Sequence, residues 1–177
     1  MATTGQTITN NVTGEKLKWL KLGTDTNGNL MQFELCVAPK GHMPVRHIHP
    51  TQSESFEVKS GIFKVECGGH YHHLKSGESV LVEPGQPHQW WNESESEEAN
   101  VIITVQPAKN FEVHMEQIYG IFNKTGRLSF LQIMTMAKKN EMVLAGIPFF
   151  IQKIMRAILS PIGKILGYKD YYPEYSS

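Results

Sequence analysis

The chain has 177 residues, about the size of one compact domain, and its 40% hydrophobic and 19% charged residues argue against disorder. Seventeen Asp and Glu balance seventeen Lys and Arg, which argues against a basic nucleic-acid-binding protein. No apolar run reaches the roughly 18 residues of a membrane-spanning helix. The N-terminal segment lacks the apolar core of an export signal, so we expect a cytoplasmic protein.

The first 107 residues have the pattern of an all-β domain. Residues alternate between apolar and polar from Met31 to Val37, which predicts a strand with one buried face. Asn27-Gly28 predicts a hairpin turn that joins this strand to an earlier run at 17–22. Further strands are expected over 45–49, 54–59, 62–67, 71–74, 79–82, 88–92 and 101–105. Many short strands separated by Gly, Pro and Asn predict a sandwich or barrel over residues 1–107.

Residues 108–177 have a helical character and are expected to form an extension. Helices are predicted over residues 111–122 and 129–139, and a third helix begins at Pro148. Pro161 and Gly163 are expected to kink or interrupt the third helix.

The third helix is amphipathic, with its polar residues on one arc and its apolar residues opposite or flanking it. The polar arc consists of Gln152, Lys153, Arg156, Ser160 and Lys164. Such a stripe can lie on a membrane surface, but we expect it to pack on the β domain or on a second subunit. Membrane association is therefore not expected.

Histidine is concentrated in the middle of the chain, where seven of eight lie between His42 and His88. His47 and His49 are two residues apart, so on a strand both imidazoles point to one face and can share an ion. The alternation that follows places Glu54 inward with Phe56, whereas Glu57 faces solvent. A carboxylate in a hydrophobic interior is costly unless it is paired or binds a cation. The pattern therefore indicates that Glu54, and not Glu57, is the carboxylate that can pair with or bind a cation.

A second segment places one more histidine at the start of a strand. Pro84-Gly85 predicts a tight turn just before His88, so His88 can join the His47 and His49 pair. The remaining histidines are expected to be structural or exposed: His42, His70, His72, His73 and His114. The two cysteines, Cys36 and Cys67, are too few for a disulfide framework and are expected to be reduced.

These two segments resemble the signature motifs of the cupin superfamily. The first motif, G-x5-H-x-H-x4-E-x6-G, is met at Gly41, His47, His49, Glu54 and Gly61. The second, G-x5-P-x-G-x2-H-x3-N, is met at Gly77, Gly85, His88 and Asn92, with Glu83 at the Pro position. The chain resembles small single-domain cupins loosely grouped with quercetin dioxygenases.

The resemblance implies a mainly β fold, a double-stranded β-helix or jelly-roll barrel, with a C-terminal helical extension. It also implies that His47, His49, Glu54 and His88 hold one divalent transition-metal ion inside the barrel. Imidazole and carboxylate ligands suit Fe, Mn, Ni, Cu, Co or Zn, so the donor set leaves the ion's identity open. Aromatic residues inside the barrel are candidates for a substrate pocket: Phe33, Phe56, Phe63 and Trp90.

The expected function is that of a metal-dependent oxidoreductase of the dioxygenase type, acting on a small organic molecule, with Glu54 as a possible general base. Two alternatives stay open. One is a metal-dependent isomerase or lyase, and the other is a non-catalytic cupin that binds a small ligand. We expect a homodimer with no nucleic-acid partner.

Overall fold

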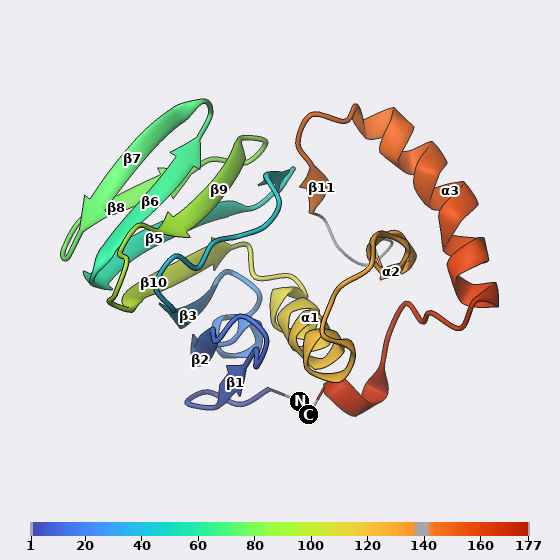
Figure 1. Ribbon diagram of the computed structural model, residues 1–177, viewed down its shortest axis with the longest axis horizontal. Helices are drawn as coiled ribbons and strands as arrows, with labels where there is room; N and C mark the ends of the chain where they lie inside the picture. Colours follow the sequence, from blue (N-terminus) through green and yellow to red (C-terminus); the bar gives the residue numbers. More distant parts are fainter. Residues whose placement is uncertain (1, 137–141, 177) are drawn as a thin grey trace.

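The structure is a computed structural model that describes residues 2–136 and 142–176, in which strands occupy the first part of the chain and helices the last part (Figure 1). The part of the chain up to Gln106 contains ten strands, which are β1 (Thr7–Thr9), β2 (Lys16–Lys21), β3 (Met31–Val37), β4 (His47–Ile48), β5 (Ser53–Ser60), β6 (Ile62–Cys67), β7 (His70–Lys75), β8 (Ser79–Val82), β9 (Pro87–Asn92) and β10 (Ala99–Gln106). The C-terminal part contains α1 (Phe111–Thr125), α2 (Phe130–Met136), β11 (Val143–Leu144) and α3 (Phe149–Ile165). Short 3₁₀ helices lie at Gly23–Thr26 and Pro173–Tyr175.

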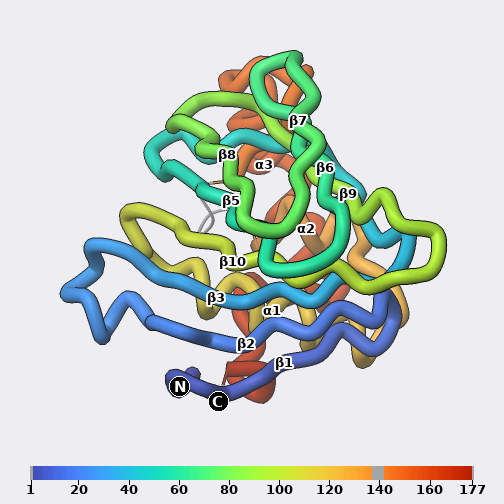
Figure 2. The backbone as a smooth tube through the Cα atoms, turned by 90° about the vertical axis from the view of Figure 1, so that its left-hand side faces the viewer, coloured from blue at the N-terminus to red at the C-terminus, as the bar shows by residue number. Residues whose placement is uncertain are grey.

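The strands form two antiparallel sheets that face each other. One sheet has the order β1-β2-β3-β10-β5-β8, and the other has the order β11-β4-β9-β6-β7. Seen from the barrel side, β1, β2 and β3 run side by side, and both chain ends lie close together beneath them (Figure 2). This is the mainly β, jelly-roll fold with a helical extension that the sequence predicts.

The core lies between the sheets because the strands alternate buried and partly exposed residues. In β3 and β10 every second side chain is buried, which confirms the alternation from Met31 to Val37. In β5 the buried set is Glu54, Phe56 and Val58, and Glu57 is exposed, as the parity of that strand predicts. The alternation of β5 therefore places both apolar side chains and the carboxylate of Glu54 in the core.

The strand predictions hold for most of the barrel and fail at short segments. Strand β4 covers only His47 and Ile48, whereas residues 45–49 were expected. Strands β1 and β11 have no counterpart among the predicted strands; β11 is a two-residue strand that pairs with β4. The second helix ends at Met136 in the described residues, and its expected end at Lys139 lies outside them.

The predicted interruption of the third helix is wrong, because α3 continues through Pro161 to Ile165. Proline removes the hydrogen bond to the carbonyl four residues earlier, that of Ala157. Both Pro161 and Ala157 are exposed, so water can satisfy the carbonyl and the helix tolerates the ring.

The orientation of α3 differs from one of the two expectations, that its apolar face packs on the β domain; packing on a second subunit stays a prediction. Its polar residues Gln152 and Ser160 are buried together with Gly163, where α3 packs against α2. Its large apolar residues point to solvent. No helix in the described part of the chain is long and apolar enough to cross a bilayer.

Candidate metal centre

Three histidines come from one sheet and the glutamate comes from the other. His47 on β4 is paired in register with His88 on β9, and His49 follows β4 by one residue. Glu54 lies on β5, in the facing sheet. The site therefore lies between the sheets, where all four side chains are buried.

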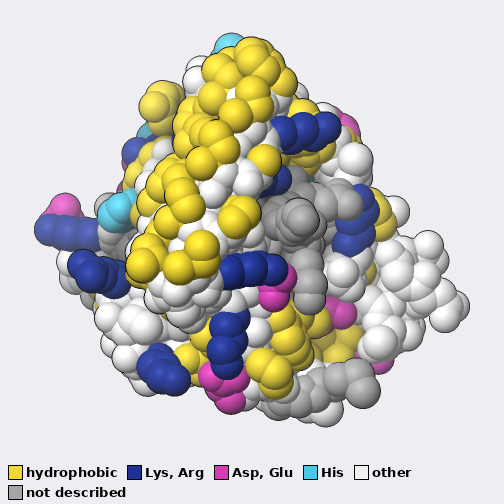
Figure 3. All heavy atoms as spheres, turned by 90° about the vertical axis from the view of Figure 1, so that its right-hand side faces the viewer, with side chains coloured by type: hydrophobic (Ala, Val, Ile, Leu, Met, Phe, Trp, Pro, Cys, Tyr) yellow, Lys and Arg dark blue, Asp and Glu magenta, His cyan; other side chains and the backbone are white. Residues whose placement is uncertain are grey.

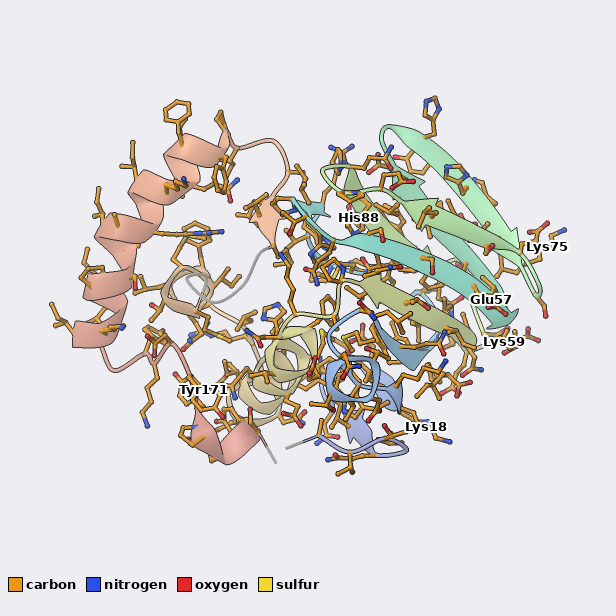
Figure 4. The ribbon with its side chains drawn as sticks, turned by 180° about the vertical axis from the view of Figure 1, so that it is seen from behind. Lys18, Glu57, Lys59, Lys75, His88 and Tyr171 are labelled. Atoms are coloured by element: carbon orange, nitrogen blue, oxygen red, sulfur yellow. The ribbon has the colours of Figure 1, made fainter. Side chains whose placement is uncertain are left out.

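The four candidate ligands converge on one point. One ligand atom from each of His47, His49, Glu54 and His88 lies within 4.8 Å of the others. The Nε2 atom of His88 is 2.9 Å from Glu54 Oε2, and the Nε2 atom of His49 is 3.7 Å from the same oxygen. His88 lies at the barrel end nearest the helices, and Glu57, Lys59 and Lys75 lie at the opposite end (Figure 4).

Backbone carbonyls orient two of the imidazoles. His47 Nδ1 lies 3.1 Å from Val45 O, and His88 Nδ1 lies 3.1 Å from Gln86 O. Because a carbonyl only accepts, Nδ1 is the donating nitrogen in each ring. Each Nε2 is thus directed to the cluster, in the arrangement that supports metal-bound histidines.

The turn before His88 joins the two motif segments. Gly85 has a φ of 82° and its amide donates to His49 O over 2.9 Å. Glu83, at the motif's proline position, donates its amide to the Gln86 side chain over 3.0 Å. This contact closes the turn without the proline.

The pKa values reflect a buried carboxylate among imidazoles. Burial lowers the pKa of His47 to about 3, and the neighbouring His88 and His49 add to that effect, so the ring is neutral. Burial raises the pKa of Glu54, but the His88 hydrogen bond and the nearby histidines outweigh it and lower the pKa to about 2. Burial lowers the pKa of His88, but the hydrogen bond and charge of Glu54 outweigh it, so the net pKa is raised.

These residues fit a divalent ion by their donor chemistry. Neutral imidazole nitrogens and one ionised carboxylate are the ligands that divalent transition metals take in proteins. The thiols do not contribute: Cys67 Sγ lies 3.0 Å from Gln86 Oε1, Cys36 Sγ lies 3.2 Å from Glu98 Oε2, and both cysteines are free. Within the described ranges, no second group of three or more His, Cys, Asp and Glu gathers in this way.

The other histidines lie outside the cluster. His73 Nδ1 contacts Glu93 Oε2 over 2.6 Å on the outer surface of the second sheet. His70 is exposed, and His42 forms an isolated bridge with Trp91.

The four predicted pocket residues are all buried in the barrel, at different distances from the cluster. The ring centroids of Phe56 and His88 are 6.4 Å apart. Phe63 stacks between Phe56 and Trp90, one layer further from the cluster. Phe33 stacks on Phe111, with ring centroids 5.9 Å apart.

Phe111 is a neighbour of the site that the motifs do not indicate. Its ring centroid is 5.9 Å from that of His49, and it is only partly buried. It begins α1, which four residues separate from the end of β10, and so reaches the cluster from the helical extension. Phe111 lies outside both motifs and so carries no motif signal, although the sequence predicted the start of a helix at this position.

The sequence motifs also gave no indication of an ion pair beside the cluster. Arg46 Nε and Nη2 donate to the two oxygens of Glu66 over 2.5 and 2.8 Å. The Arg46 hydrogen bonds hold the pKa of Glu66 below its usual range. The pair fixes the segment just before His47 onto β6.

Comparison with known proteins agrees with this geometry. Residues 33–105 match the family described as Cupin domain. The fold is similar to that of an RmlC-like cupin from Shewanella frigidimarina, with 24% identity, a TM-score of 0.52 and coverage of 64% of this chain and 95% of that one. It is also similar to a predicted oxalate decarboxylase from Thermotoga maritima, with 15% identity, a TM-score of 0.50 and coverage of 59% and 92%.

Two curated fungal proteins are similar in sequence. An oxidoreductase of Arthrobotrys oligospora is 28% identical over 155 residues, which covers 77% of this chain and 61% of that protein. The epoxidase atD of Aspergillus terreus is 26% identical over 150 residues, which covers 76% of this chain and 47% of that protein. The chain thus spans about half to three fifths of the length of these relatives. The two motifs, the two facing sheets and the family match together show that the β domain of this chain is a cupin domain.

Proposed function

We propose that this protein is a metal-dependent oxidoreductase, of the dioxygenase type, that acts on a small organic molecule. The observation that carries the proposal is the convergence of His47, His49, Glu54 and His88 within 4.8 Å inside the barrel. We assign these four residues as ligands of one divalent transition-metal ion.

The choice of redox chemistry is supported by the relatives. Both curated relatives carry names of oxygen or redox chemistry, an oxidoreductase and an epoxidase. A redox-active ion held by His47, His49, Glu54 and His88 would supply the chemistry that activates dioxygen beside a substrate.

The chain's own residues would bind the substrate and exclude water. Phe56 and Phe111 present aromatic rings to His88 and His49, so they favour a flat apolar substrate. The buried carboxylate of Glu54 is ionised, and we assign Glu54 Oε2 as the group that would accept a substrate proton.

The first experiment measures metal by elemental analysis of protein purified without chelators. We expect a stoichiometric transition metal in the wild type, and occupancy at least about tenfold lower in His49→Ala and Glu54→Gln. His70→Ala is the matched control, because His70 is exposed outside the cluster, and it should retain the metal. Equal occupancy in all variants, with folding verified by circular dichroism, would refute the ligand assignment.

The second experiment measures oxygen uptake by the metal-loaded protein with flavonols, diketones and catechols. Metal-dependent uptake that Glu54→Gln abolishes and His70→Ala retains supports the proposal. A fully loaded protein that consumes no oxygen with any of them overturns the dioxygenase activity.

A further inference from the structure

The outer surface of α3 is an apolar ridge. Four of its side chains are more than half exposed: Phe150 at 64%, Ile154 at 55%, Ile158 at 58% and Ile165 at 84%. Hydrophobic side chains run along the whole helix in the view that faces it, with Lys and Arg side chains beside them (Figure 3). We call this set the α3 ridge, which consists of Phe149, Phe150, Ile151, Ile154, Ile158, Ile162, Ile165 and Leu166.

Polar contacts on the inner face hold the helix in this orientation. The Gln152 side chain accepts from Leu144 N and donates to Leu144 O and Ile147 O, over 3.0, 2.9 and 2.7 Å. On the same face, a Cβ added to Gly163 would overlap Thr135 of α2. Turning the ridge inward would break these hydrogen bonds and separate the two helices. The outward position of the ridge is therefore built into the packing.

Helix α3 itself carries cations and no acidic residue. From Met142 to Lys169 the sequence has four cations, Lys153, Arg156, Lys164 and Lys169, and no Asp or Glu. Lys153 and Lys169 are exposed, and each ammonium group lies over a neighbouring aromatic ring. Lys164 is partly offset by Asp170 at 2.9 Å. The surface combines exposed apolar side chains with positive flanks.

We propose that the α3 ridge docks onto the surface of a membrane that contains anionic phospholipids, with the helix lying in the interface. Apolar side chains on one side and Lys or Arg beside them are the features of interfacial helices, in which anionic headgroups complement the cations. With 17 residues, α3 suits a position in the interface plane and is too short to span the bilayer. This proposal replaces the expectation of no membrane association, which assumed that the helix packs on the β domain or on a second subunit.

A second copy of the chain is the less favoured occupant of the ridge. Two α3 helices that paired through their ridges would bring the lysines beside one ridge near those beside the other, without an acidic residue on α3 to offset them. Like charges at such a contact oppose association, whereas an anionic surface attracts them. The expected homodimer then uses another face and stays a prediction.

The test is flotation of the full chain with vesicles of phosphatidylcholine alone or mixed with phosphatidylserine. We expect binding to the mixed vesicles that weakens as salt is raised, and at least about tenfold less binding to phosphatidylcholine alone. The double variant Ile154→Glu and Ile158→Glu should lose at least about tenfold of the binding. The matched control, Ile62→Glu and Leu81→Glu, changes two exposed apolar residues of the barrel and should bind as the wild type does.

Variants that remove lysine charges measure the electrostatic contribution to vesicle binding. Lys153→Gln with Lys169→Gln should reduce binding to the anionic vesicles by roughly fivefold or more, since each cation near the surface contributes. Lys59→Gln with Lys75→Gln makes the same charge change at the far end of the barrel and should leave binding unchanged (Figure 4). Circular dichroism and melting temperature verify that each variant is folded.

Two results would overturn the proposal. One is wild-type protein that remains entirely in the non-floating fraction with the anionic vesicles. The other combines two measurements: the wild type does not bind vesicles, and it sediments as a dimer that the Ile154→Glu and Ile158→Glu double variant converts to a monomer. That result would assign the ridge to contact with a second copy of the chain. Neither result depends on the metal or on catalysis, so the proposed function is tested separately.

Discussion

Asn92, the last residue of the second motif, supports the scaffold rather than the metal centre. Its side-chain Nδ2 donates to three backbone carbonyls, those of Val37, Ala38 and Glu97, over 2.8 to 3.0 Å. Its Oδ1 accepts from the amide of Ser94 over 2.9 Å. One buried amide thus joins the end of β3 to the loop between β9 and β10.

Asn92→Ala should destabilise the protein by roughly 2–4 kcal/mol, because it leaves buried carbonyls without a donor. The measurement is the free energy of unfolding from urea titration. Asn100→Ala is the control, since its amide contacts only Ser60 Oγ at an exposed position, and it should cost less than about 0.5 kcal/mol. A loss below about 1 kcal/mol in Asn92→Ala would contradict this structural role.

Glu93 should make stability depend on pH. Burial raises the pKa of Glu93, but hydrogen bonds from His73 and Lys64 outweigh it and lower the pKa below its usual range. A depressed carboxyl pKa contributes stability that is present above the unfolded value of about 4.5 and is lost as the pH falls through the folded value. The contacts are partly exposed, so we expect only about 0.5–1 kcal/mol at pH 7.

Glu93→Gln should therefore lower the free energy of unfolding at pH 7 and lose this effect near pH 3. Urea titrations of wild type and variant at both pH values measure the difference. Glu57→Gln removes one exposed carboxylate that contacts Lys59 at 3.4 Å, and it should show a smaller change. A Glu93→Gln deficit that stays constant from pH 7 to pH 3 would contradict the ionic origin.

The sequence predicted those site residues that belong to an alternating strand or to one of the two motifs. Parity alone distinguished Glu54 from Glu57, since a strand presents alternate residues to opposite faces. Phe111 and Glu66 could not be found in this way, because their proximity to His49 and Arg46 depends on contacts between segments far apart in the chain. Register within a strand is a local property, whereas such contacts are tertiary.

At the scale of elements, α3 shows the limit of periodicity as a guide to orientation. Its 3.6-residue pattern correctly predicts a helix with one polar and one apolar face. The pattern cannot say which face packs inward, and the usual rule fails here because Gln152 bonds to the backbone at Leu144 and Ile147. Close packing at Gly163 against Thr135 has the same effect.

Gly163→Leu should therefore separate α3 from α2. We expect a loss of roughly 1–3 kcal/mol in the free energy of unfolding and faster proteolysis of the C-terminal extension, because the added side chain overpacks the contact. Ala157→Leu is the matched control on the same helix, where the side chain faces solvent. Equal protease sensitivity in the two variants would show that the close contact at Gly163 does not hold the helices together.

At the scale of the whole molecule, the candidate metal centre depends on the pairing of distant segments. The order of the two sheets brings β4, β9 and β5 around the cluster, and β11 from the extension adds to β4 opposite His47. The sequence predicted the barrel from its turns and motifs, but a two-residue strand such as β11 exists only through its tertiary partner. The extension thus reaches the cluster through β11, and also through Phe111 of α1.

Because the ligands come from both sheets, metal binding should stabilise the entire fold. A metal that binds only the native state at a free concentration about 100 times its Kd adds about 2.7 kcal/mol. For a chain of this length that corresponds to a rise in melting temperature of about 7 °C. Thermal melts with and without added divalent metal measure the shift. His70→Ala should retain it and Glu54→Gln should lose most of it. A wild-type Tm that no transition metal changes would mean that no ion joins the two sheets at this site.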